Sequence, residues 1–294
     1  MGNSCPCQYV TSEQIDTDEI EDLRVEPKRK LDMSNIIKFQ ATWRGYSLRK
    51  KLNKEMSDFV EMRHTDNTAD FLAEDNRENN DEIGKFFEDG GLYKGELNGN
   101  VREGQGIHTW PDGSVYEGSW KNDKANGKGK FTDCQGNAYN GDWKDDQAHG
   151  YGTFIKADGS KYEGEWWNDQ PHGKGTEIWP NKDMYVGEYV NGSKEGQGEF
   201  IWADGSHYKG GVKKNKFHGS GTYKWNNGKS YSGEWVNGKR EGYGVFKWPN
   251  GNVYMGNFKS DKRHGKGKIT LANGKQVVGY WNQGKFNKHQ VKNK

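Results

Sequence analysis

A tyrosine that recurs every 23 residues constrains this chain more than any other feature of its sequence. A glycine stands two positions after each tyrosine, and a large residue usually follows two positions after the glycine, with Leu97 and Val212 as the exceptions. No insertion or deletion interrupts the period, which predicts a repeat architecture whose units pack on their neighbours. The column consists of Tyr93, Tyr116, Tyr139, Tyr162, Tyr185, Tyr208, Tyr231, Tyr254 and finally Val277.

Each repeat unit has the pattern of a β-hairpin. Side chains alternate between the two faces of a strand, so Tyr116, Gly118 and Trp120 are expected on one face. A polar loop is expected over residues 121–126, and the second strand is expected to begin at Gly127.

Turns with suitable chemistry separate the hairpins. Pro111-Asp112-Gly113 and Ala157-Asp158-Gly159 place a glycine where a turn needs positive φ. Lys182 alone interrupts this second column of glycines.

The glycines on the aromatic face suggest how the rings pack. A ring can lie flat over a neighbouring strand only where that strand has no side chain, so we expect Gly118 and Gly127 to make room for rings. Two strands per unit give a sheet of roughly 17 strands. The predicted fold is mainly β: an elongated, twisted, single antiparallel sheet of 23-residue hairpins, preceded by a helical or disordered N-terminal region.

Composition agrees with an aromatic core. A mean hydropathy of -1.21 would by itself predict weak core formation, but 12 Trp, 15 Tyr and 12 Phe supply large apolar area. The sequence has no apolar run of transmembrane length and no secretory signal, so we expect a cytoplasmic chain. Cys5, Cys7 and Cys134 have neither zinc spacing nor a disulfide framework.

Charge is distributed unevenly along the chain. Residues 1–92 hold 13 Lys and Arg against 20 Asp and Glu, and residues 93–208 hold 12 against 19. Residues 209–294 reverse the balance, with 19 against 3. This basic end is expected to attract anionic surfaces such as acidic phospholipids or acidic protein tails. The alternative is that its lysines only keep the sheet soluble.

Residues 1–27 suggest a lipid-anchored, otherwise disordered N-terminus. Gly2, Cys5 and Cys7 resemble a myristoylation and palmitoylation signal, although Pro6 stands where that pattern has Ser or Thr. The alternative is a disordered tail with two free thiols.

Residues 28–57 predict a basic amphipathic helix. Between residues 28 and 54 there are nine basic residues and one acidic residue, interleaved with apolar residues at helical spacing. The segment resembles the IQ motif, which implies binding of calmodulin or a centrin-like EF-hand protein. The alternatives are a surface helix packed on the array and an amphipathic helix on an anionic membrane. The residues that carry this resemblance are Phe39, Gln40, Arg44, Gly45, Arg49 and Leu52.

Residues 58–89 are acidic and are expected to form a linker. Ile83, Phe86 and Phe87 are candidates for a short cap over the open edge of the first repeat.

The array at residues 90–285, which a basic tail at 286–294 follows, resembles the MORN repeat. The resemblance implies a scaffold of membrane junctions, cortical cytoskeleton or ciliary radial spokes. MORN arrays also occur beside phosphatidylinositol phosphate kinase and SET methyltransferase domains. Only about ten residues follow the array, so we expect neither domain here.

The motifs that suggest an enzyme have a simpler interpretation as repeat positions. Gly-Lys-Gly-Lys at residues 127–130 and 265–268 lacks the spacing of a phosphate loop. The His-Gly pairs at 149, 172, 218 and 264 have no nucleophile elbow beside them. We therefore expect no catalytic residue, no bound metal and no cofactor.

The sequence predicts a non-enzymatic scaffold that docks protein partners at a membrane or cortical cytoskeleton, with a calmodulin-like light chain on the helix and no nucleic acid. An axonemal component resembling radial spoke head proteins is the alternative, and a regulatory relative of phosphatidylinositol phosphate kinases is a weaker one. Homodimerisation is left open. The docking face is predicted to consist of exposed rings, namely Tyr116, Trp120, Tyr139, Trp143, Tyr162, Trp166, Tyr185, Tyr231 and Trp235.

Overall fold

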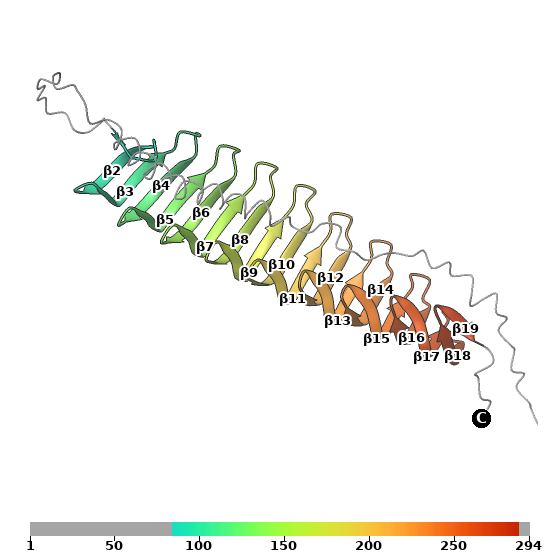
Figure 1. Cartoon of the computed structure of the whole chain (residues 1–294). Coiled ribbons are helices and arrows are strands. Elements are labelled where there is room, and N and C mark those ends of the chain that lie inside the picture. The colour runs from blue at the N-terminus through green and yellow to red at the C-terminus, as the bar shows by residue number, and fades with distance from the viewer. Residues whose placement is uncertain (1–83, 288–294) are drawn as a thin grey trace, which may run out of the picture. The chain divides into compact units, whose positions relative to one another are not determined.

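The computed structural model describes residues 84–287, in which every regular element is a β-strand. Nineteen strands form one antiparallel sheet (Figure 1). Seventeen of them, β2 to β18, have seven or nine residues, whereas β1 and β19 are short. The predicted antiparallel sheet of hairpin repeats is confirmed.

Contacts divide the described residues into two compact units. The N-terminal unit holds residues 84–180 and 189–192, and the C-terminal unit holds residues 181–188 and 193–287. The strands of the N-terminal unit are β1 (Lys85–Phe86), β2 (Leu92–Asn98), β3 (Val101–Thr109), β4 (Val115–Lys121), β5 (Lys124–Thr132), β6 (Ala138–Lys144), β7 (Gln147–Ile155), β8 (Lys161–Trp167) and β9 (Gln170–Ile178).

The residues of β10 (Met184–Val190) are divided between the two units. The strands of the C-terminal unit are β11 (Ser193–Ile201), β12 (His207–Lys213), β13 (Lys216–Lys224), β14 (Ser230–Val236), β15 (Lys239–Lys247), β16 (Val253–Lys259), β17 (Lys262–Thr270), β18 (Gln276–Asn282) and β19 (Lys285–Asn287).

The hairpin turn is shorter than predicted. Residues 121–126 are not a loop: Asn122 and Asp123 alone form the turn, with φ angles of 49° and 63°, and β5 begins at Lys124. Asn and Asp tolerate the left-handed conformation that a two-residue hairpin turn requires.

The same two-residue turns also form hydrogen bonds to the neighbouring repeat. Asp123 Oδ1 accepts a hydrogen bond from the backbone N–H of Arg102, 21 positions earlier, at 2.8 Å. This contact joins the turn of one hairpin to the start of the second strand of the preceding hairpin, so the residue serves as an inter-repeat clamp. Equivalent clamps are Asp146 on Ala125, Asp169 on Ala148, Asn215 on Lys194 and Asp261 on Arg240.

The other turns contain the predicted glycines. Gly113 has a φ of 88°, and its N–H donates to the carbonyl of Trp110. Lys182, at the position where the column lacks glycine, still adopts a φ of 68°. The backbone of the repeat is therefore retained there despite the side chain.

A bulge accompanies a second strand longer than the first in seven hairpins, namely β2–β3, β4–β5, β6–β7, β8–β9, β12–β13, β14–β15 and β16–β17. Gly118 pairs with Gly129, but Trp120 pairs with Ala125, so the pairing shifts between them. Gly127 lies in this bulge with a φ of 98°, and a Cβ there would approach Ser119 rather than a ring. The prediction that Gly127 makes room for a ring is wrong, and Gly129 has that role instead.

The N-terminal edge of the sheet has a partial cover. β1 pairs with β2 through two residues, and the Phe87 ring lies 5.8 Å from the Tyr93 ring. Phe86 points away and is 75% exposed, and Ile83 lies outside the described residues. Among the described residues, no helix is long and apolar enough to cross a membrane.

Candidate functional site

The rings predicted to dock partners form an internal packed row. The Tyr116 ring lies over Gly118 and Gly129, where a Cβ on Gly129 would lie 2.5 Å from the tyrosine Cζ. The Tyr116 hydroxyl donates to the carbonyl of Ser119 at 2.9 Å, and Trp120 Nε1 donates to the carbonyl of Gly106 at 3.1 Å. Both polar tips are thereby satisfied within the sheet.

Successive rings contact one another edge to face. Tyr116 lies between two tryptophans. Its ring centroid is 4.9 Å from that of Trp120 in its own repeat and 5.3 Å from that of Trp143 in the next repeat. Interplanar angles of 82° and 89° are those that aromatic pairs prefer. Tyr139 and Trp166 repeat the arrangement at 5.0 Å.

These contacts correct the predicted exposure of the docking face. Each of the nine rings is at most 5% exposed. The glycine beneath each tyrosine lets the ring lie flat, and neighbouring rings cover its edges, so the row is a core. The exposure inferred from sequence is wrong for Tyr116, Trp120, Tyr139, Trp143, Tyr162, Trp166, Tyr185, Tyr231 and Trp235.

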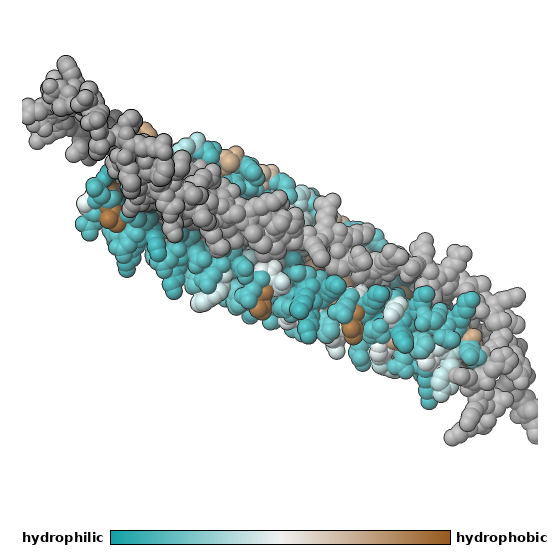
Figure 2. Space-filling model, in the orientation of Figure 1, coloured by the Kyte–Doolittle hydropathy of each residue, from teal (hydrophilic) through white to brown (hydrophobic). Residues whose placement is uncertain are grey.

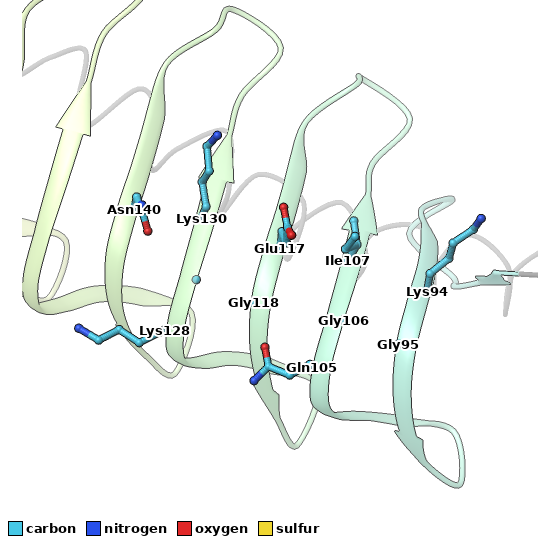
Figure 3. Close-up of a pocket in the computed structure, with 11 residues that line it drawn as sticks. Lys94, Gly95, Gln105, Gly106, Ile107, Glu117, Gly118, Lys128, Lys130 and Asn140 are labelled. Atoms are coloured by element: carbon cyan, nitrogen blue, oxygen red, sulfur yellow. The ribbon is translucent and has the colours of Figure 1, made fainter. Parts of the chain in front are cut away.

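The opposite face of the N-terminal unit carries an open trough of about 640 Å³. Glycines of neighbouring strands pair directly along its floor: Gly95 with Gly106, Gly106 with Gly118, and Gly118 with Gly129. Since glycine has no side chain, the backbone itself is the floor, and a bound chain can approach it closely. Figure 3 shows one rim with Lys94, Ile107, Glu117, Lys130 and Asn140, and the other with Gln105 and Lys128.

The rims of this trough combine apolar area with both signs of charge. Ile107 is 41% exposed between the ionisable side chains. Lys128 Nζ lies 2.6 Å from Oδ1 of Asp142. Partial burial raises the pKa of Asp142, but hydrogen bonds from Lys128 and from the Tyr151 N–H outweigh it and leave that pKa below its ordinary value. The trough can therefore present fixed charges and one apolar contact to a polar chain.

Sequence reasoning did not find this trough. The glycine columns were assigned to ring packing on one face, and their consequence for the other face was overlooked. A signal was present, because each glycine column lies between two columns of polar residues that side-chain alternation places on the face opposite the rings. Figure 2 shows a largely hydrophilic visible surface with isolated hydrophobic residues.

The remaining predicted sites lie outside the described residues. These are the EF-hand-binding residues Phe39, Gln40, Arg44, Gly45, Arg49 and Leu52, and the lipid-anchor residues Gly2, Cys5 and Cys7. Within residues 84–287, Cys134 is exposed and unpaired, and no group of three or more His, Cys, Asp or Glu residues could hold a metal ion.

Two solved structures illustrate what the sheet is similar to. The TCP10 domain of Danio rerio CPAP is 13% identical, with 67% of this chain and 99% of that chain covered and a TM-score of 0.37. The Drosophila melanogaster SAS-4 (dCPAP) TCP domain, in complex with a proline-rich motif of Ana2 (dSTIL), is 8% identical, with 53% and 85% covered and a TM-score of 0.34. At these TM-scores neither likeness carries a functional argument.

Eight consecutive segments of the chain match the MORN repeat model. The matched residues are 93–115, 116–138, 139–161, 162–184, 185–207, 208–230, 231–253 and 254–276, and each segment begins at a residue of the tyrosine column. No curated protein matches the chain. The matched segments cover more than half of the sequence, and the chain belongs to the MORN repeat family.

Proposed function

We propose that this chain is a non-enzymatic scaffold whose N-terminal unit docks an extended segment of a protein partner in the outer trough. MORN repeats are typical of repeat-based binding proteins, and the ring row is occupied with internal packing. The observation that carries the proposal is the glycine-floored trough, whose rims offer Lys94, Lys130 and Glu117 beside the exposed Ile107. A flat backbone floor flanked by polar side chains suits an extended chain.

The test requires a partner recovered with the full chain and then purified. Changing Ile107→Arg together with Lys130→Glu alters the apolar contact and one rim charge. Ile178→Arg with Lys174→Glu is the matched control, because both residues belong to β9 in the same unit and lie outside the trough. We expect the trough variant to weaken binding by about tenfold or more, since truncation of a central contact has effects of this size. Equal binding by both variants would exclude the trough.

We also propose a calmodulin-like light chain on the segment that resembles an IQ motif. Its support is the spacing of Phe39, Arg44 and Arg49 among basic residues in the sequence. Purified calmodulin and centrin, each tested with calcium and with chelator, should bind the full chain and lose binding to Phe39→Ala with Arg44→Ala. Absence of binding in all conditions excludes this proposal.

The place of action is proposed from the first residues of the sequence. An acyl chain on Gly2 with a second on Cys5 or Cys7 would hold the scaffold at a membrane, since one chain alone gives only marginal binding. Membrane signal of tagged protein should disappear on Gly2→Ala with Cys5→Ser. Signal along detergent-extracted axonemes that persists in this variant favours the ciliary alternative instead.

A further inference from the structure

One repeat position in the C-terminal unit is lysine in four successive hairpins. Each of these lysines begins a second strand, β13, β15, β17 or β19, directly after the two-residue turn. Two more lysines end the first strand before such a turn and a third, Lys214, lies in a turn; all seven side chains are exposed. We call this set the lysine edge: Lys213, Lys214, Lys216, Lys239, Lys259, Lys262 and Lys285.

The lysine edge has little opposing charge. Within the described part of the chain, none of its ammonium groups lies in an ion pair. Asp261 is the single acidic residue in the four turns, and its Oδ1 already accepts hydrogen bonds from the N–H of Arg240 at 2.9 Å and from Arg240 Nε at 3.2 Å. Glu195 and Glu241 lie next to the turns, and each accepts a turn N–H, at 3.0 Å and 2.9 Å.

The N-terminal unit balances its charge at the same position. In that unit, Lys124 Nζ lies 3.9 Å from Oδ1 of Asp145, which is the first residue of the next hairpin turn. The residues that correspond to Asp145 in the C-terminal unit are Lys214, Asn237, Ser260 and Gln283, and none of them is acidic. All four still adopt positive φ, so the turn is retained while the partner charge is gone. The hairpin fold therefore does not require the unbalanced charge.

We propose that the lysine edge binds an acidic polypeptide segment in extended conformation. Each hairpin adds two strands, so successive edge lysines are about 10 Å apart, which is the length of about three extended residues. Four hairpins span about 30 Å, so an acidic segment of about ten residues can contact them all. Exposed ion pairs are individually weak, but a row of them gives salt-dependent binding.

The geometry favours a polypeptide over a bilayer. The charges follow one line of turns, and the four turns contain no aromatic residue. Val236, the last residue of β14 and 42% exposed, lies beside one of these turns. Stable binding to a bilayer needs buried apolar area in addition to charge, and these turns supply little. This surface is separate from the trough and does not depend on it.

Fluorescence anisotropy with the full chain tests the proposal. The probe is a labelled ten-residue peptide of alternating Glu and Ser, and the matched peptide carries Gln in place of Glu. The edge variant is Lys216→Gln, Lys239→Gln, Lys262→Gln and Lys285→Gln. The control variant removes the same charge from elsewhere in the C-terminal unit: Lys224→Gln, Lys247→Gln, Lys266→Gln and Lys275→Gln.

We expect the affinities of wild type and of the control variant for the Glu peptide to agree within about threefold. The edge variant should bind this peptide about tenfold more weakly, because only that variant removes the aligned charges. The Gln peptide should not bind. The proposal is overturned if the Glu peptide does not bind, if the Gln peptide binds equally, or if both variants lose affinity equally. It is also overturned if phosphatidylserine vesicles or duplex DNA bind the edge more tightly than the peptide.

Discussion

The two units of the array pack tyrosine rings over glycines in the same way but differ in the residues that face each other beside those rings. In the N-terminal unit, Trp120 pairs with the small Ala125 across the hairpin. In the C-terminal unit, Val212 replaces the large ring and pairs with Phe217, which stacks on Tyr208 at 3.7 Å. The comparison of these two hairpins teaches that the large ring can come from either of the two facing positions, as long as the space is filled.

The units differ even more in charge. The N-terminal unit holds 11 Lys and Arg against 16 Asp and Glu, whereas the C-terminal unit holds 18 against 8. The difference is concentrated in residues 209–287, which hold 16 against 3. The tyrosine and glycine columns are nevertheless continuous through both units. The surface charge therefore changes without a change in the residues that form the core. The columns form that core, and the positions between them are free to carry binding functions.

The largest loss of stability should come from adding a side chain to a glycine that lies beneath a tyrosine ring. Gly129→Ala in the N-terminal unit and Gly221→Ala in the C-terminal unit each place a Cβ against a tyrosine ring. We expect each to lower the free energy of unfolding by about 3 kcal/mol, measured in urea, because the overlap involves a buried ring.

Glycines with positive φ and open space provide the control for this prediction. Gly159→Ala and Gly205→Ala meet no atom within 4 Å. They carry only backbone strain, so about 1 kcal/mol is expected. Equal losses of stability for the glycines beneath rings and for the turn glycines would show that the rings do not need the glycines.

The exchange of volume between Val212 and Phe217 can be reversed. Val212→Trp alone overfills the C-terminal unit and Phe217→Ala alone leaves a cavity, so each should cost about 2–3 kcal/mol. The double variant recreates the Trp and Ala pair of the N-terminal unit. Its cost should fall at least about 1 kcal/mol below the sum of the single costs in a urea-unfolding cycle. Additive costs would mean that the two positions do not share one volume.

Acid should weaken the N-terminal edge through Asp89. Burial raises the pKa of Asp89, but His108, the Gly91 N–H and the charge of Arg102 outweigh it and lower that pKa from 3.8 to about 2. A lowered folded-state pKa stabilises the fold above the unfolded pKa, and this contribution is lost as pH falls from about 4 to about 2. Asp89→Asn should reduce stability at neutral pH by on the order of 1 kcal/mol and flatten this acid dependence. An unchanged pH profile contradicts the assignment.

The smallest effect concerns the clamp, for which the C-terminal unit uses both an amide and a carboxylate. Asp146 Oδ1 accepts a hydrogen bond from the Ala125 N–H at 2.7 Å in the N-terminal unit, whereas the C-terminal unit uses Asn215 on Lys194 and Asp261 on Arg240. Burial raises the pKa of Asp146, so its stabilising contribution is lost as pH rises. Asp146→Asn should keep the hydrogen bond and, at pH 7, match or exceed wild type by a few tenths of a kcal/mol. A loss comparable to that of Asp146→Ala would show that the charge matters.

The hairpin repeat was predictable because its period, its alternation and its turn glycines each have a direct structural cause. The turn at Asn122 and Asp123 was missed because two polar residues in left-handed conformation look like part of a longer loop until the clamp on Arg102 is seen. The role of Gly127 was misassigned because the bulge shifts the pairing between Gly118 and Trp120.

The candidate site was harder to predict than the fold. Aromatic residues in a single sheet suggested an exposed face, but the edge-to-face contacts of Tyr116 with Trp120 and Trp143 depend on ring geometry that the sequence does not give. The basic end was visible from composition. The row of edge lysines became clear only once the two-residue turns before Lys216 and its equivalents were placed.

A transfer of the lysine edge tests the central claim, that the columns form the fold while the positions between them bind. In one variant of the full chain, Lys216, Lys239, Lys262 and Lys285 become Gln, and Val101, Gln147 and Gln170 become Lys, joining Lys124. Asp123, Asp145, Asp146 and Asp169 become Asn in the same variant, so that the new row of lysines also faces little opposing charge. Cross-linking mass spectrometry then locates the bound Glu peptide. The account predicts an affinity within about threefold of wild type, since the same four charges are aligned. It also predicts cross-links that move from the C-terminal turns to those at residues 101–170, without loss of stability. Cross-links that remain in the C-terminal unit, or binding that is lost altogether, would contradict it.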